Sequence, residues 1–222
     1  MKNIVVTGAN RGIGLELVRQ YSVDSKVTAI CRSSSKALKM LPNVTVIDSV
    51  DLQSYESISY GMSKCIDKID VLINNAGILD RVTLDTIDQS NIQKINSQFQ
   101  TNSLAPLIVV NQLLGKFNDN AKIILMSSRM GSIDDNSTGS HYGYRMSKAA
   151  LNMAGKSLSI DLKEAGISVG IIHPGWVKTD MTGHTGHYNV DTAVKQVMDR
   201  IDDLNLSNSG TFWHSDGQVL PW

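Results

Sequence analysis

The chain has 222 residues, of which 41% are hydrophobic, so it is long enough for one α/β domain with a full core. Its formal net charge of zero gives no electrostatic support for a nucleic-acid partner or an anionic membrane surface. No apolar run approaches the ~18 residues of a membrane span, and the stretch 104–114, which contains Pro106, predicts a packed helix instead.

Short apolar runs, often β-branched, alternate with stretches of helical spacing along the whole chain. The predicted strands lie near residues 3–7, 26–31, 44–48, 70–74, 121–127, 167–172 and 211–214. Strands that alternate with helices predict an α/β fold with a single doubly wound, seven-stranded parallel sheet and helices on both faces. Because no linker, repeat or low-complexity stretch interrupts this pattern, we expect one domain over residues 1–222.

A glycine-rich turn follows the first predicted strand and precedes the helical stretch 15–21. Such a turn presents free N–H groups and the positive end of a helix dipole to an anion. Glycine permits a positive φ angle and the close approach of a pyrophosphate. The spacing differs from the G-x-G-x-x-G fingerprint, so a turn of another α/β protein remains an alternative. The predicted dinucleotide cradle consists of Gly8, Asn10, Arg11, Gly12, Ile13 and Gly14.

The end of the second strand indicates which dinucleotide is bound. A carboxylate there would bind the ribose 2′-hydroxyl and repel a 2′-phosphate, but the strand ends in Cys31 and Arg32. Arg32 and Arg11 could hold a 2′-phosphate through charge-assisted hydrogen bonds. We therefore expect NADP(H) rather than NAD(H); the alternative is that both arginines are solvated surface residues.

Two tyrosine–lysine pairs occur with the four-residue spacing that places both side chains on one helix face, Tyr60/Lys64 and Tyr144/Lys148. An adjacent ammonium and a positively charged nicotinamide would lower the tyrosine pKa, which makes the phenol a usable acid or base. Tyr60 lies in the predicted helix 53–66, whereas Tyr144 follows the fifth strand, at the edge where open α/β sheets bind ligands. We expect Tyr60/Lys64 to be a surface pair and Tyr144/Lys148 to be the active pair.

Together with Asn74-Asn75-Ala76-Gly77 and Ser127-Ser128, these patterns make the chain resemble the short-chain dehydrogenase/reductase family over essentially its whole length. The resemblance implies an NAD(P)-binding Rossmann domain over residues 1–222. It implies a catalytic tetrad of Asn102, Ser128, Tyr144 and Lys148. It also implies cofactor contacts from Asp51, Leu52, Asn75, Ala76, Gly77, Tyr144, Lys148, Pro174, Gly175, Val177 and Thr179. The residues around the tetrad and the closing segment 216–222 are similar to a carbonyl-reductase-like branch, which includes sniffer-type reductases and C-factor-like proteins.

Two members of the tetrad have rivals in the sequence. A polar loop, 134–139, lengthens the interval between Ser128 and Tyr144, so Ser127 is an alternative to Ser128. Tyr142 is a similar alternative to Tyr144, but it has no lysine four residues later.

The expected reaction is the reduction of an aldehyde, ketone or quinone, in which NADPH gives a hydride to the carbonyl carbon. Tyr144 would donate the proton, Ser128 would orient the carbonyl oxygen, and Lys148 would bind the nicotinamide ribose. By family resemblance, Asn102 would anchor a water. The alternatives are an NAD-dependent alcohol dehydrogenase and a cofactor-binding sensor of the C-factor type with little turnover. The complete tetrad argues against a sensor.

The segment 180–189 is short, polar and rich in histidine, which suggests an open substrate site. Candidate substrate contacts are Met130, Trp176 and His184. The histidines lack the further ligands of a metal site and the H-E-x-x-H pattern, so we expect no metal. No G-x-S-x-G motif supports a hydrolase.

Location and assembly are predicted by weaker signals. The first predicted strand follows Met1 without a signal peptide, so a cytoplasmic location is expected. Cys31 and Cys65 are expected to be free thiols. In many family members the counterpart of the predicted helix 142–165 packs across a two-fold axis, which favours a homodimer or homotetramer, although the carbonyl-reductase branch includes monomers.

Overall fold

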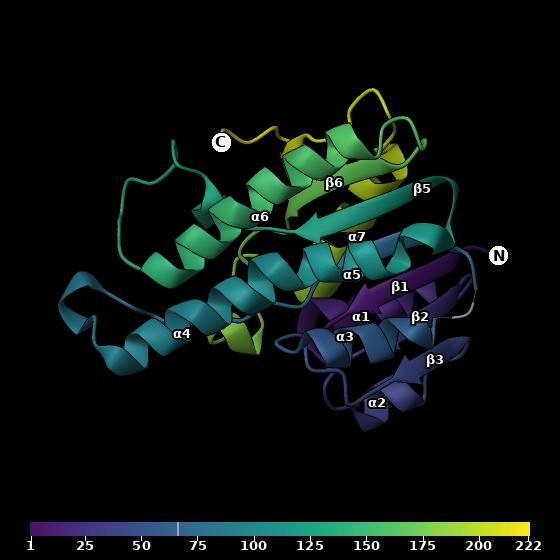
Figure 1. Cartoon of the computed structure of the whole chain (residues 1–222), viewed down its shortest axis with the longest axis horizontal. Coiled ribbons are helices and arrows are strands. Elements are labelled where there is room, and N and C mark those ends of the chain that lie inside the picture. The colour runs from purple at the N-terminus through teal and green to yellow at the C-terminus, as the bar shows by residue number, and fades with distance from the viewer. Residues whose placement is uncertain (66) are drawn as a thin grey trace.

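The computed structural model describes residues 1–65 and 67–222, and in it seven strands form one sheet (Figure 1). The strands are β1 (Asn3–Thr7), β2 (Lys26–Ile30), β3 (Val44–Ile47), β4 (Ile69–Asn74), β5 (Phe117–Met126), β6 (Ser168–His173) and β7 (Phe212–His214). Their order is β3-β2-β1-β4-β5-β6-β7, and every neighbouring pair is parallel. The order changes direction between β1 and β4, so a crevice forms at the carboxyl ends of these strands. The predicted doubly wound parallel sheet is confirmed.

Helices cover both faces of this sheet. They are α1 (Gly12–Tyr21), α2 (Lys36–Lys39), α3 (Tyr55–Ser63), α4 (Gln89–Phe99), α5 (Ala105–Leu113), α6 (Tyr142–Asp161) and α7 (Val190–Asp203). Alternate strand residues face opposite cores: Val5 of β1 packs in the core beneath α3, α5 and α6, whereas Ile4 and Val6 pack in the core beneath α1 and α7. Each face of the sheet therefore has its own apolar core.

The predicted and observed boundaries of helices and strands differ mainly where polar residues join a strand or cap a helix. Strand β5 begins at Phe117 rather than near residue 121, because Phe117 pairs with Ile69 of β4 despite the polar stretch that follows it. Helix α3 begins after Ser54, whose hydroxyl accepts a hydrogen bond from Ser57 N at 3.1 Å. The predicted end of that helix, residue 66, lies outside the described residues.

The two cysteines lie in opposite cores, Cys31 beneath α1 and Cys65 beneath α3, and both are free thiols, as predicted. Where the chain is described, none of its helices is both long enough and apolar enough to cross a membrane.

Candidate active site

The glycine turn between β1 and α1 packs backbone to backbone against the segment after β4. Gly8 has a φ of +66°, and a Cβ there would lie 2.8 Å from the Cα of Ala76. A Cβ on Gly14 would collide with Gly8 O and Asn75 Nδ2. The Asn75 amide in turn donates to the carbonyl oxygens of Thr7 (3.1 Å) and Gly8 (3.3 Å). Larger residues at Gly8 or Gly14 would therefore push these two segments apart.

Helix α1 begins at the far side of this turn and faces it with its positive end. Arg11 is the N-cap residue, but its side chain makes no capping hydrogen bond, and the first turn contains no acidic residue. The helix dipole is therefore left uncompensated by the chain itself, which suits the binding of an anion such as a pyrophosphate.

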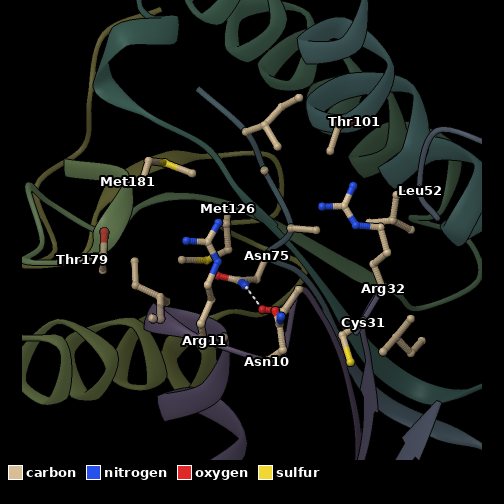
Figure 2. A pocket seen from close by; sticks show the side chains of 18 of the residues that line it. Asn10, Arg11, Cys31, Arg32, Leu52, Asn75, Thr101, Met126, Thr179 and Met181 are labelled. Atoms are coloured by element: carbon tan, nitrogen blue, oxygen red, sulfur yellow. Dashed lines mark hydrogen bonds between the residues drawn. The ribbon is translucent and has the colours of Figure 1, made fainter. Parts of the chain in front are cut away.

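A cleft of about 310 Å³ opens above this turn (Figure 2). The predicted cofactor residues that line it are Gly8, Asn10, Arg11, Gly12, Ile13, Gly14, Arg32, Asp51, Leu52, Asn75, Ala76, Gly77, Tyr144, Lys148 and Thr179. Figure 2 shows Arg32, Leu52 and Cys31 together at one end, and Arg11, Thr179 and Met181 at the other. The structure thus brings residues from six parts of the chain to one cleft.

Three predicted cofactor residues do not line this cleft: Pro174, Gly175 and Val177. Val177 is buried and forms a β-bridge with Tyr188, and a Cβ on Gly175 would lie 2.9 Å from the Tyr188 ring. These residues hold the cover segment 180–189 in place from behind. Conversely, the sequence did not indicate Thr101, Met126 and Met181, which line the cleft but belong to none of the motifs singled out in the sequence.

Tyr144 and Lys148 lie one turn apart on α6 and are both buried. Lys148 Nζ donates to Met126 O at 2.7 Å and lies 5.8 Å from the centre of the Tyr144 ring. Burial lowers the pKa of Lys148 to about 8. Burial also raises the pKa of Tyr144, and a hydrogen bond with Ser128 only partly opposes this. In the absence of a cofactor, loss of solvation therefore dominates the pKa of Tyr144, and the lowering expected from Lys148 together with a charged nicotinamide stays a prediction.

The two adjacent serines have different partners. Ser127 lines the cleft, but its hydroxyl donates to Asn152 Oδ1 at 2.5 Å. Ser128 accepts a hydrogen bond from Met130 N at 3.2 Å, and its side chain faces the phenol of Tyr144. The geometry therefore favours Ser128 over Ser127 for contact with a substrate oxygen.

Tyr144 is also distinguished from its rivals by burial. Tyr144 is 7% exposed and lines the cleft, whereas Tyr142 is 37% exposed. Tyr60 is 60% exposed on α3, and Lys64 Nζ lies 4.1 Å above its ring. The second tyrosine–lysine pair is therefore a surface cation–π pair, as predicted.

Asn102 is fully buried in a π-helical segment, Gln100–Leu104, that joins α4 to α5. Its amide accepts from Ile78 N (2.8 Å) and donates to Ile78 O (2.9 Å), while Nδ2 also lies 3.0 Å from Ser147 Oγ. A Cβ on Gly77 would lie 3.3 Å from Asn102 Oδ1 and 3.6 Å from Lys148 Nζ. Gly77 thus leaves the space between the asparagine and the lysine open. Such π-segments often occur at functional sites, and no sequence signal revealed this one.

The predicted substrate residues Met130, Trp176 and His184 do not line the cleft. Trp176 is half exposed and packs edge-on against another ring of the cover segment, that of His187. His184 Nε2 lies 3.1 Å from Asp180 Oδ1, and the other oxygen of Asp180 pairs with Arg11 at 3.0 Å. The cover segment is therefore tied by an ion pair to the glycine turn, and the three substrate contacts remain predictions.

The chain matches the short chain dehydrogenase family over residues 2–205. It belongs to this family. This short-chain dehydrogenase is 34% identical to 1-hydroxy-2-glutathionyl-2-methyl-3-butene dehydrogenase of Rhodococcus sp. over 230 residues, which cover all of both chains. It is 38% identical to the C-signal protein of Myxococcus xanthus over 167 residues, which are 74% of this chain and 99% of that protein.

Solved structures place the short-chain dehydrogenase in the predicted branch. The NADPH-bound carbonyl reductase from chicken fatty liver is 31% identical with a TM-score of 0.89, over 100% of this chain and 99% of that one. The carbonyl reductase Sniffer of D. melanogaster has the same identity and TM-score over 100% of both chains. The predicted resemblance to the carbonyl-reductase-like branch is confirmed.

Proposed function

We propose that this short-chain dehydrogenase is an NADPH-dependent reductase of aldehydes, ketones or quinones. The observation that carries the proposal is the position of Tyr144: its phenol is buried in the wall of the dinucleotide cleft, with Lys148 below it and Ser128 facing it. A neutral phenol next to a hydroxyl can donate a proton to a carbonyl oxygen that both groups contact. We further infer that residues 1–222 act as one domain.

The cleft fits a nicotinamide dinucleotide. The glycine turn and the positive end of α1 suit the pyrophosphate, and Asp51 and Leu52 line the end where the adenine would lie. Arg32 lines the same end as Asp51 and Leu52 and would hold a 2′-phosphate there, whereas Arg11 lines the other end and pairs with Asp180. The NADPH-bound chicken reductase supports this preference.

When bound, NADPH supplies the hydride. Tyr144 donates a proton to the substrate oxygen, and Ser128 hydrogen-bonds the same oxygen and orients it. Lys148 would hold the nicotinamide ribose. The hydrogen bond that its ammonium donates to Met126 O fixes the ammonium in place. Asn102, which is hydrogen-bonded to Ile78, would anchor a water in the space beside Gly77. This water would return a proton to Tyr144 through Lys148. These roles require no other protein, nucleic acid or membrane.

A fluorescence titration with NADPH and NADH, followed by NADPH oxidation with quinones, aldehydes and α-diketones, tests the proposal. We expect tighter binding of NADPH and turnover of at least one carbonyl class. Tight binding without turnover of any carbonyl would contradict the reductase and favour the sensor, a role consistent with the similarity to C-signal. A preference for NADH would contradict the role of Arg32.

A further inference from the structure

Arg145 follows Tyr144 on α6 and carries a charge that no carboxylate neutralises. Its guanidinium donates to Gly139 O (3.0 Å), Thr138 Oγ1 (2.8 Å) and Met130 O (3.4 Å), all of which are uncharged acceptors. Among the described residues, no Asp or Glu oxygen lies within 4.0 Å of it. These bonds hold the positive charge near the turn after Ser128, because Met130 lies in that turn, and leave it free of any ion pair.

A second guanidinium reaches the same place from the segment after β4. Ile78 lines the cleft, and four residues later Val82 O accepts a hydrogen bond from Tyr142 N, the first residue of α6, at 3.2 Å. Arg81 precedes Val82, is exposed, and forms no ion pair within the described part of the chain. The bond between Val82 and Tyr142 thus places Arg81 beside the start of α6, in the segment that continues from Ile78 in the cleft wall.

The start of α6 lacks the acceptors that usually complete a helix N-terminus. His141, the N-cap residue, makes no side-chain capping bond, and the first turn contains no acidic residue. Ser140 and His141 both have left-handed φ angles, 59° and 51°, although neither is glycine, and such strain gathers at functional sites. The Ser140 hydroxyl is buried without a hydrogen-bond partner. Burial, followed by Arg81 and Arg145, lowers the pKa of His141, which confirms that the surroundings are cationic.

Two of the carboxylates near the start of α6 have other partners. Asp135 pairs with Arg129 at 2.6 Å. Asp85 accepts a hydrogen bond from Thr83 at 2.5 Å, and although Arg81 lowers the pKa of Asp85, the two form no ion pair. Neither of these two carboxylates forms an ion pair with Arg81 or Arg145.

We propose that Arg81, Arg145 and the start of α6 bind a carboxylate of the substrate, beside the carbonyl that Tyr144 protonates. This inference rests on the proposed reductase, and it narrows the substrate class to carbonyl compounds that carry an acidic group. The site would orient the substrate by its charged end, so that the carbonyl group meets Tyr144 and Ser128.

The test compares 4-formylbenzoate with its methyl ester, which has the same ring and aldehyde but no charge. Isothermal titration of the NADPH complex should give a Kd about tenfold lower for the acid than for the ester. Arg81→Met removes a charge that forms no ion pair in the described chain. In this variant, the ratio of the ester Kd to the acid Kd should fall by about fivefold. Lys163→Met is the matched control, because it removes an exposed charge just beyond the opposite end of α6, and its ratio should equal that of the wild type.

Equal affinity for acid and ester, undetectable binding of the acid, or an unchanged ratio in Arg81→Met would overturn the carboxylate site. NADPH oxidation in the same solutions judges the reductase separately. A low Kd for the acid without turnover of either aldehyde would contradict the proposed function while it supports the site.

Discussion

At the scale of single residues, the chemistry depends on how strongly burial desolvates the phenol of Tyr144 and the ammonium of Lys148. The sequence reveals the Tyr144/Lys148 spacing and so identifies the pair, but burial is a property of the packed protein. In the structure, burial raises the pKa of Tyr144 and lowers that of Lys148, so it disfavours the charged form of each group. A bound cofactor must therefore supply the charge that favours an ionised tyrosine.

The pKa of Lys148 predicts how cofactor binding depends on pH. Because burial lowers this pKa to about 8, the ammonium that would hold the ribose is present below pH 8 and is lost above it. The Kd for NADPH should therefore rise above pH 8, by up to about tenfold for each further pH unit. Fluorescence titration between about pH 7 and pH 9 measures this, with Lys64→Met as a control that keeps the wild-type slope. A Kd that stays constant across this range would contradict the assigned role.

The lowered pKa of Lys148 also makes the free energy of unfolding depend on pH. The unfolded lysine keeps its proton up to its ordinary pKa of 10.5, whereas the folded one loses it at about 8. The cost of burying the charge is thus fully present below pH 8 and disappears as the pH rises toward 10.5, so Lys148 alone makes the free energy of unfolding rise over that interval.

At the scale of elements, the site depends on close packing between the loop after β5 and helix α6. Gly131 lies in the 3-10 turn after Ser128, and a Cβ there would come within 2.9 Å of the backbone C and O and of the Cβ of Lys148. The sequence predicted both elements from their patterns. It could not predict this contact, because no turn motif in the sequence marks Gly131 as a position where a side chain would clash.

We expect Gly131→Ala to lower the free energy of unfolding by about 1–3 kcal/mol, because backbone atoms of α6 would have to move. The displacement of Lys148 should also weaken NADPH binding. Gly115→Ala is the matched control: a Cβ there meets nothing within 4 Å, so its effect should stay within about 0.5 kcal/mol. Urea denaturation of both variants measures the difference. Equal stability of the two variants would show that the loop adapts without strain.

At the scale of the whole molecule, strand order and layers follow from the alternating pattern, but the surface of α6 carries further information. Met146, Met153 and Ile160 are 54%, 67% and 64% exposed and recur every seven residues, so they form one apolar stripe. The sequence predicted that α6 lies at a subunit interface by family resemblance, and the stripe is consistent with that prediction.

If this stripe is a subunit interface, Met153→Glu should convert a homodimer into a monomer, because an unpaired charge would be buried at its centre. Sedimentation velocity at micromolar concentration measures the change. Met40→Glu, which alters an equally exposed methionine outside the stripe, should leave the assembly unchanged. A wild-type protein that sediments as a monomer would contradict the predicted oligomer.

The substitution Tyr144→Phe, measured for both turnover and NADPH binding, tests the central claim most directly. Removal of the phenolic oxygen takes away the proton donor but keeps the ring that lines the cleft, so turnover should fall by about 10²- to 10⁴-fold while the Kd for NADPH stays within about twofold. Tyr142→Phe removes a hydroxyl from the same helix turn and should keep wild-type turnover. Near-normal turnover by Tyr144→Phe would contradict the assignment of Tyr144 as the proton donor.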